Sequence, residues 1–122
     1  MNNAERQRFQ RWARLNDPLQ YRQVFERAIR SSDRAFTVLA RENSYGCARL
    51  GLAISRKCAA RAVARNRIKR LVRESFRLAQ HELTALDIVV TCKPVVNTMT
   101  NQEVAAALQA HWECLKEQCK NS

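Results

Sequence analysis

Residues 55–77 hold the side chains of this chain that are best suited to bind a charged partner. The segment carries nine cations and a single acid, Glu74, and so contributes +8 to a net charge of +11. The whole chain has seventeen Arg and five Lys, and a guanidinium pairs with phosphate oxygens through two parallel hydrogen bonds. Such repulsion among like charges favours a polyanionic partner, so we expect the phosphate backbone of a nucleic acid. The nine cations are Arg56, Lys57, Arg61, Arg65, Arg67, Lys69, Arg70, Arg73 and Arg77.

The sequence lacks the residue patterns with which a protein performs catalysis or binds a metal. Its two glycines, Gly46 and Gly51, are too few for a glycine-rich phosphate loop. There is no serine nucleophile elbow, HExxH motif or carboxylate pair, so we expect no catalytic residue. The five cysteines form no CxxC pair and show no metal-ligand spacing. We therefore expect reduced, mostly buried thiols, and no metal or other cofactor bound by the protein. The cysteines are Cys47, Cys58, Cys92, Cys114 and Cys119.

Length and composition predict one folded domain with a basic arm. A chain of 122 residues with 46% hydrophobic residues is large enough for a single core. Residues 1–16 are polar and arginine-rich and are expected to form an N-terminal arm, whereas residues 17–119 are expected to form one α/β domain. No stretch approaches the roughly 18 consecutive apolar residues of a membrane span. The N-terminal residues lack the apolar core of a secretory signal, so we expect a cytoplasmic protein without membrane contact.

Three elements are predicted before the cationic segment. Asp17 followed by Pro18 is a typical helix start, and apolar residues at helical spacing continue to about Arg30. Strands are expected over Ala35–Arg41 and Ala48–Ser55. Because these strands are close together in sequence, we expect them to form an antiparallel pair.

Three more elements are predicted from the cationic segment onwards. A long helix is expected from about Ala59 to Gln80, followed by a nearly continuous apolar strand over Leu86–Lys93 that is typical of burial on both faces. Thr100–Glu103 forms a capping box that predicts the start of a last amphipathic helix. The expected apolar stripe of that helix is Val104, Leu108, Trp112, Leu115 and Cys119.

The long helix is predicted to have one packing face and one cationic face. With about 100° between successive residues, the apolar side chains fall on an arc centred on Ile68. The other members of this arc are Ala64, Leu71, Val72, Ser75, Phe76, Leu78 and Ala79. The opposite arc carries Asn66, Lys69, Arg70, Arg73 and Arg77. Arg65 and Arg67 are expected at the two borders between the faces.

Aromatic residues near the N-terminus give a second indication of binding. Tyr21 and Phe25 are four residues apart on the first predicted helix, and Phe36 begins the first predicted strand. In an ordinary domain all three would be core residues. If they line an open groove instead, they would offer faces on which unpaired bases can stack.

The string RNRIKRLVRESFR, residues 65–77, resembles the signature of the protein subunit of bacterial ribonuclease P, in its proteobacterial form. RLGLAISRK at residues 49–57 and DIVV at residues 87–90 resemble the strands that flank this signature in the family. Tyr21 and Phe25 match the family's aromatic pair on the first helix. The resemblance extends from about residue 14 to residue 116.

The resemblance implies a fold, a function and partners. The implied fold is α+β, a sandwich of a small mixed sheet of about four strands with three helices, and with a left-handed βαβ crossover around the basic helix. The implied function is that of the protein component of a ribozyme that removes the 5′ leader from precursor tRNA. In that enzyme the RNA subunit carries the catalytic site and its divalent ions, normally Mg²⁺. The expected partners are this catalytic RNA and precursor tRNA, with one protein per RNA.

The resemblance also implies roles for particular residues. It places Arg65, Asn66, Arg67, Lys69 and Arg70 on the RNA subunit, and it places Arg56 and Lys57 near the cleft for the leader. With Arg61 and Arg73, which the charge pattern adds, these residues form the expected RNA-binding set. Tyr21, Phe25 and Phe36 are expected to line a cleft for the single-stranded leader.

Two positions depart from the family pattern. Cys58–Arg61 stands where many members have a Gly-Asn pair, and Leu39 stands where a cleft tyrosine is common.

Two other function classes remain open from the residues alone. A general RNA-binding or ribosome-associated basic protein would bind unrelated RNAs with similar affinity. A DNA-binding regulator would aim side chains of the basic helix at base edges and would usually be a dimer.

Overall fold

The computed structural model of this chain describes residues 29–120, with the side chains of residues 29–118. Within that part, four strands form one sheet: β1 (Ile29–Ser32), β2 (Phe36–Glu42), β3 (Arg49–Ala53) and β4 (Leu86–Cys92). Two α-helices, α3 (Ala62–Ala79) and α4 (Asn101–Lys120), and a short 3-10 helix, η1 (Pro94–Thr98), complete it. The expected N-terminal arm, and residues 17–28 of the expected first helix, lie outside the described residues.

The predicted first helix does not reach Arg30, because β1 begins at Ile29. β1 runs antiparallel to β2, with Ile29 opposite Ala40 and Ser32 opposite Thr37. Apolar spacing in the sequence favoured a helix here, but pairing with a neighbouring strand outweighs such local preference.

The strands are arranged in the order β1-β2-β4-β3. β4 runs antiparallel to β2 and parallel to β3, so the sheet is mixed, as the resemblance implied. The predicted antiparallel pairing of β2 with β3 is wrong, because β4 lies between them. The apolar sequence of β4 predicted burial on both faces, and this is confirmed by Ile88 and Val89, which point to opposite faces and are both buried.

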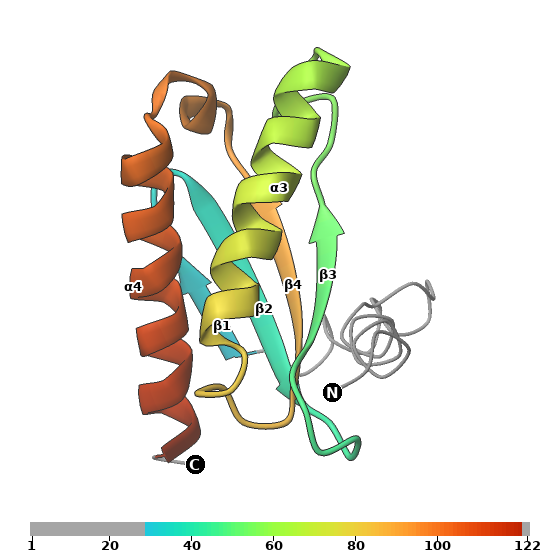
Figure 1. Ribbon diagram of the computed structural model, residues 1–122, viewed down its shortest axis with the longest axis vertical. Helices are drawn as coiled ribbons and strands as arrows, with labels where there is room; N and C mark the ends of the chain where they lie inside the picture. The colour runs from blue at the N-terminus through green and yellow to red at the C-terminus, as the bar shows by residue number, and fades with distance from the viewer. Residues whose placement is uncertain (1–28, 121–122) are drawn as a thin grey trace.

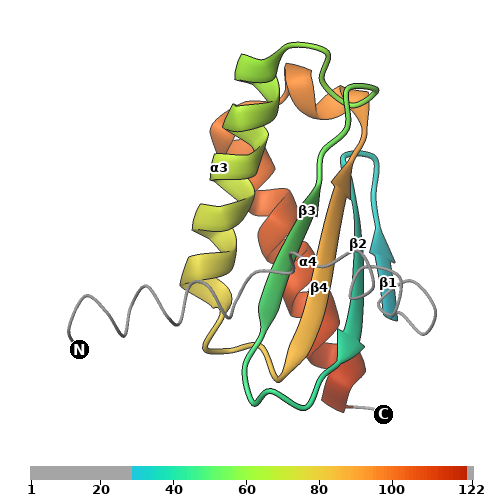
Figure 2. The ribbon, with the colours of Figure 1, turned by 90° about the vertical axis from the view of Figure 1, so that its right-hand side faces the viewer.

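Both helices cover the same face of the sheet. α3 lies over β3 and β4, and α4 lies beside it over β1 and β2 (Figures 1 and 2). Seen from the helix side, β3 and β4 run in the same direction, and β4 lies to the left of β3 (Figure 1). The β3–α3–β4 crossover is therefore left-handed, as the resemblance implied and contrary to the usual right-handed rule.

The packing face of α3 agrees with the prediction except at one position. Ile68, Val72, Phe76 and Ala79 are buried against the sheet and α4. Leu78 is 70% exposed, so its predicted burial is wrong. Leu78 is at the edge of the apolar arc, and the neighbouring layers cover a narrower arc than the sequence suggested.

The start and the apolar stripe of α4 are confirmed. The hydroxyl of Thr100 accepts a hydrogen bond from the Glu103 backbone N–H (3.1 Å), and the Glu103 carboxylate accepts one from the Thr100 N–H (2.9 Å). This is the reciprocal arrangement of a capping box. The stripe residues Val104, Leu108, Trp112 and Leu115 are fully buried, whereas the side chain of Cys119 lies outside the described residues.

A buried histidine joins α4 to the turn between β1 and β2. His111 Nδ1 is 2.7 Å from the Ser31 hydroxyl, and His111 Nε2 is 3.0 Å from an Asp33 carboxylate oxygen. Burial tends to raise the pKa of Asp33, but hydrogen bonds from the Phe36 and Ala35 backbone N–H groups and the nearby His111 outweigh it. The pKa of Asp33 is therefore below its ordinary value, and its ionised form stabilises this corner of the fold.

Two of the cysteines form a disulfide, contrary to the expectation of reduced thiols. Cys58 and Cys92 are bonded, with their Cα atoms 5.9 Å apart. Because β3 and β4 are parallel neighbours, with Ala53 opposite Thr91, the residues that follow the two strands meet at one edge of the sheet. The sequence separation of 34 residues hid this proximity.

Neither α3 nor α4, nor any other helix among the described residues, combines the length and the apolar character that a membrane span needs.

Candidate nucleic-acid interface

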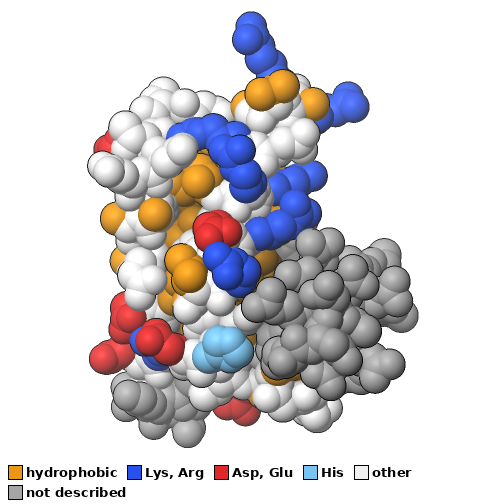
Figure 3. Space-filling model, viewed as in Figure 1, with side chains coloured by type: hydrophobic (Ala, Val, Ile, Leu, Met, Phe, Trp, Pro, Cys, Tyr) orange, Lys and Arg blue, Asp and Glu red, His pale blue; other side chains and the backbone are white. Residues whose placement is uncertain are grey.

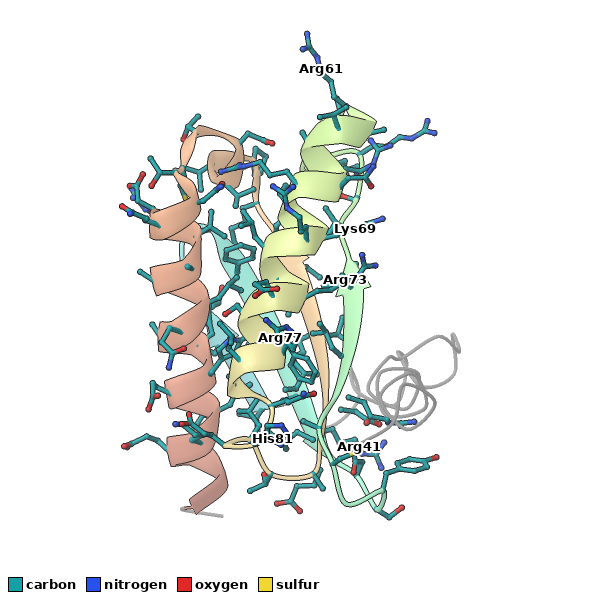
Figure 4. The ribbon with its side chains drawn as sticks, viewed as in Figure 1. Arg41, Arg61, Lys69, Arg73, Arg77 and His81 are labelled. Carbon is teal, nitrogen blue, oxygen red and sulfur yellow. A yellow bond between two sulfur atoms is a disulfide. The ribbon has the colours of Figure 1, made fainter. Side chains whose placement is uncertain are left out.

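Cations recur at every fourth residue along α3 and form what we call the cationic row: Arg61, Arg65, Lys69, Arg73 and Arg77. Four residues of a helix rise about 6 Å, so the row extends along the whole helix. Figure 4 shows Arg61, Lys69, Arg73 and Arg77 following α3 from its first turn to its last, with His81 just beyond its end. In Figure 3, Lys and Arg side chains gather over α3, whereas acidic side chains lie mainly near the lower end of α4.

Other residues of the expected RNA-binding set lie close to this row. Asn66 and Arg70 are exposed on α3, and Arg56 and Lys57 are exposed in the segment that joins β3 to α3. The fold thus brings the nine predicted RNA-binding residues onto one helix and the segment immediately before it. Their contact with RNA stays a prediction.

Arg65 and Arg67 are held in place by the protein itself. Arg65 Nη1 donates to the backbone carbonyls of Ala59 (3.0 Å) and Ala60 (2.8 Å). Arg67 donates from Nε to the Asn101 side chain (3.0 Å) and from Nη2 to the Met99 carbonyl (2.7 Å). Both side chains are half-buried, which confirms their predicted place at the borders of the helix.

These bonds orient the two guanidinium groups without using all their donors. A guanidinium carries five N–H groups, and neither arginine commits more than two nitrogens to the bonds described above. Arg65 therefore fixes the first turn of α3 to the preceding segment, and Arg67 fixes α3 to the start of α4. Both can still present N–H groups to a phosphate in a preset orientation.

The N-terminal half of α3 is electrostatically unfavourable in the protein alone. Its first turn contains no acidic residue, and its N-cap, Arg61, makes no side-chain capping bond. Cations at a helix N-terminus oppose the helix dipole, which favours anions there. A phosphate group near this end would interact favourably with the helix dipole and would reduce the repulsion among the cations.

Near the C-terminal end of α3, Glu74 Oε1 accepts a hydrogen bond from Arg77 Nη2 at 2.7 Å.

A second ordered cluster lies on the sheet face opposite the helices. Arg49 is 6% exposed and donates to both carboxylate oxygens of Asp87, at 2.7 Å from Nε and 2.6 Å from Nη2. These bonds to Asp87 raise the pKa of Arg49 despite its burial. The Tyr45 ring lies 3.9 Å from the Arg49 guanidinium carbon, and Asn43 donates to Asp87 at 2.7 Å. This cluster could not be predicted from the sequence, because the pairing of Arg49 with Asp87 depends on the β3–β4 register.

The prediction that Phe36 lines a cleft for the leader is wrong, because Phe36 is a core residue and does not reach the open face of the sheet. Its side chain is fully buried on the helix side, with its ring edge-to-face with His111 at a centroid distance of 6.4 Å. Side chains alternate along a strand, and Phe36 shares its parity with the core residue Val38. The opposite parity belongs to Leu39, which packs against Val89 on the other face. The other two predicted cleft residues, Tyr21 and Phe25, lie outside the described residues.

The described residues contain no group of three or more His, Cys, Asp or Glu side chains that could hold a metal ion. The exposed charged groups of α3 are mainly Arg side chains.

Comparisons with known proteins all lead to one protein family. The Ribonuclease P family model matches residues 9–116. The ribonuclease P protein component of Thioalkalivibrio sulfidiphilus is 50% identical over 115 residues, which are 94% of this chain and 96% of that protein. The corresponding component of Escherichia coli O157:H7 is 46% identical over 104 residues, 85% of this chain and 87% of that protein.

Two solved structures share the fold. The RNase P protein from Thermotoga maritima superimposes with a TM-score of 0.73 at 28% identity, covering 85% of this chain and 96% of that chain. A Staphylococcus aureus RNase P protein mutant with defective mRNA degradation activity gives a TM-score of 0.82 at 25% identity, covering 98% of both chains.

Proposed function

This chain belongs to the ribonuclease P protein family, and we propose that it acts there through the cationic row of α3 and the sheet face opposite the helices. It is the protein component of ribonuclease P, an accessory subunit of a ribonucleoprotein endoribonuclease that processes tRNA, and catalysis belongs to the RNA subunit. The protein's own contribution is therefore binding and positioning.

The cationic row and its neighbours bind the phosphate backbone of the RNA subunit. The observation that carries this proposal is the fixed orientation of Arg65 and Arg67 beside a line of exposed cations on one helix. Each phosphate that a cation neutralises releases condensed counterions, so affinity depends steeply on salt. Preset arginines lose less conformational freedom on binding than mobile ones.

The single-stranded 5′ leader of precursor tRNA contacts the sheet face opposite the helices, with Tyr21 and Phe25 as stacking partners. Leu39, which is half-buried, and Tyr45, which is 48% exposed, give that face an aliphatic and an aromatic group against which bases can pack. The catalytic Mg²⁺ belongs to the RNA subunit, one protein binds each RNA, and the complex works in the cytoplasm.

Reconstitution with the RNA subunit from the same organism tests this proposal. The protein alone should not cleave precursor tRNA, and adding it to the RNA subunit should increase cleavage at low Mg²⁺ concentration. Its affinity for the RNA subunit should exceed that for an unrelated structured RNA of equal length. Equal affinity for both RNAs would favour a general RNA-binding role instead.

Leader binding has a separate test within the same complex. Precursor tRNA with a leader of several nucleotides should bind the holoenzyme more tightly than mature tRNA. The Tyr21→Ala, Phe25→Ala double variant should reduce that difference, while a Leu78→Ala control should retain it. If leader length has no effect on affinity for the protein-containing enzyme, the proposed leader site is wrong.

A further inference from the structure

Cys58 and Cys92 are placed where a covalent bond can act on the RNA-binding segment. Cys58 directly follows Arg56 and Lys57, and Cys92 ends β4. Cys58 is 4% exposed, and its backbone carbonyl accepts a hydrogen bond from Asn97 Nδ2 at 2.7 Å. Cys92 is half-buried, so it is the more exposed residue of the pair.

The disulfide between them encloses the whole of α3. Its ring runs from Cys58 through the cationic row to Cys92, a separation of 34 residues. On the N-terminal side of the ring the exposed Arg56 and Lys57 are attached directly to Cys58. The bond thus fixes the start of the RNA-binding surface to the end of the central strand.

Disulfides are rare where RNA is processed, in the reducing cytoplasm, and those that occur there are usually transient or redox-sensing. We propose that the Cys58–Cys92 pair is a redox-modification site that reacts with low-molecular-weight disulfides of the glutathione class, and that its oxidation state sets the affinity for the RNA subunit. This inference rests on the proposed RNA-binding function.

The chemistry is two successive thiol–disulfide exchanges. The Cys92 thiolate attacks one sulfur of oxidised glutathione, which forms a mixed disulfide and releases one glutathione thiolate. The Cys58 thiolate then attacks the Cys92 sulfur and releases the second glutathione. The protein loses two protons and two electrons, and the glutathione disulfide is reduced to two thiols.

Oxidation strengthens RNA binding, because the bond orders the Arg56–Lys57 segment before the RNA arrives. Preorganisation of a loop removes ordering entropy from the binding step. Thermodynamic linkage then requires the reciprocal effect. RNA binding must favour the disulfide over the dithiol by the same factor by which oxidation favours RNA binding.

The test uses the full chain with Cys47, Cys114 and Cys119 replaced by Ser, so that Cys58 and Cys92 are the remaining thiols. Mass spectrometry after equilibration with defined ratios of reduced and oxidised glutathione gives the fraction of disulfide, with and without the RNA subunit. Binding of the oxidised and dithiothreitol-reduced forms to the RNA subunit is measured at one salt concentration. Because both forms come from one chain, no further variant has to fold.

We expect the oxidised form to bind about fivefold or more tightly, near the lower end of the range for coupled sites. The RNA should shift, by the same factor, the ratio of the squared concentration of reduced glutathione to the concentration of oxidised glutathione at which half of the protein is oxidised. Equal affinity of the two forms, or failure of glutathione disulfide to oxidise the pair, would overturn the redox inference and leave the proposed function intact. If neither form binds the RNA subunit, the proposed function itself fails.

Discussion

Ile68 and Leu78 offer a matched test of how α3 is packed. Both are large aliphatic residues of one helix, and the sequence predicted both to be buried. Ile68 is completely buried, whereas Leu78 is 70% exposed. Truncation of each to Ala therefore compares nearly the same chemical change in two environments, and neither change touches the cationic row.

Ile68→Ala removes buried carbon atoms and leaves a cavity, which costs roughly 2–5 kcal/mol in protein cores. The higher helix propensity of Ala returns a few tenths of a kcal/mol, so the net loss of unfolding free energy should be about 2–4 kcal/mol. This corresponds to a fall in Tm of about 10 °C or more for a domain of this size. Leu78→Ala loses little burial and should stay within about 0.5 kcal/mol of the parent.

Urea unfolding followed by circular dichroism measures both changes. The midpoint should shift for Ile68→Ala at constant m-value, because the area exposed on unfolding hardly changes. A loss for Leu78→Ala as large as that for Ile68→Ala, or no loss for Ile68→Ala, would show that the packing face of α3 is assigned wrongly.

Asp87, Asp33 and Glu74 each pair with a basic side chain, and removal of each acid has a measurable effect. Asp87→Asn should destabilise the fold by about 3–5 kcal/mol, because it leaves the buried Arg49 without its counter-ion. An Arg49→Met, Asp87→Leu double variant removes both charges, so chemical unfolding should show it to be more stable than Asp87→Asn. The lowered pKa of Asp33 contributes stability that is present above the ordinary carboxyl pKa of about 3.9 and is lost as the pH falls further. Asp33→Asn should therefore flatten the fall in Tm between about pH 5 and about pH 2, and an unchanged profile would contradict this. Glu74→Gln removes the acid that pairs with Arg77, so it should strengthen binding to the RNA subunit and steepen the salt dependence of that binding. Weaker binding in a salt titration would show that the RNA requires the Glu74–Arg77 pair and not the unpaired Arg77.

Features set by local chemistry could be predicted from the sequence. The capping box at Thr100 and Glu103 needs only residues three apart, and both of its hydrogen bonds are present. The helical period around Ile68 separated a packing face from a cationic face because both depend on one helix alone. The borders occupied by Arg65 and Arg67 followed from the same geometry.

Features set by long-range pairing could not be predicted from the residues alone. β4 lies between β2 and β3 although it follows them in sequence, and this register brings Arg49 to Asp87. The parallel pairing of β3 with β4 also brings Cys58 to Cys92. The mixed sheet and its left-handed crossover came only from a family resemblance, and the strand order was not predicted at all.

Phe36 shows a different limit, since its residue type suggested stacking on bases. Its parity in β2 directs the ring into the helix-side core instead. The alternation of apolar residues at 36, 38 and 40 was visible in the sequence and could have assigned Phe36 to the same face as Val38.

The most direct test of the central claim, that exposed cations of α3 contact RNA phosphates, is the salt dependence of binding to the RNA subunit. Arg70→Ala and Arg73→Ala should each weaken binding and reduce the slope of log K against log salt by up to about one unit. Lys116→Ala, which removes a cation paired with Glu82 and Glu113 on the α4 side, should leave the slope unchanged. Slopes for the two arginine variants that equal that of the parent would contradict the claim.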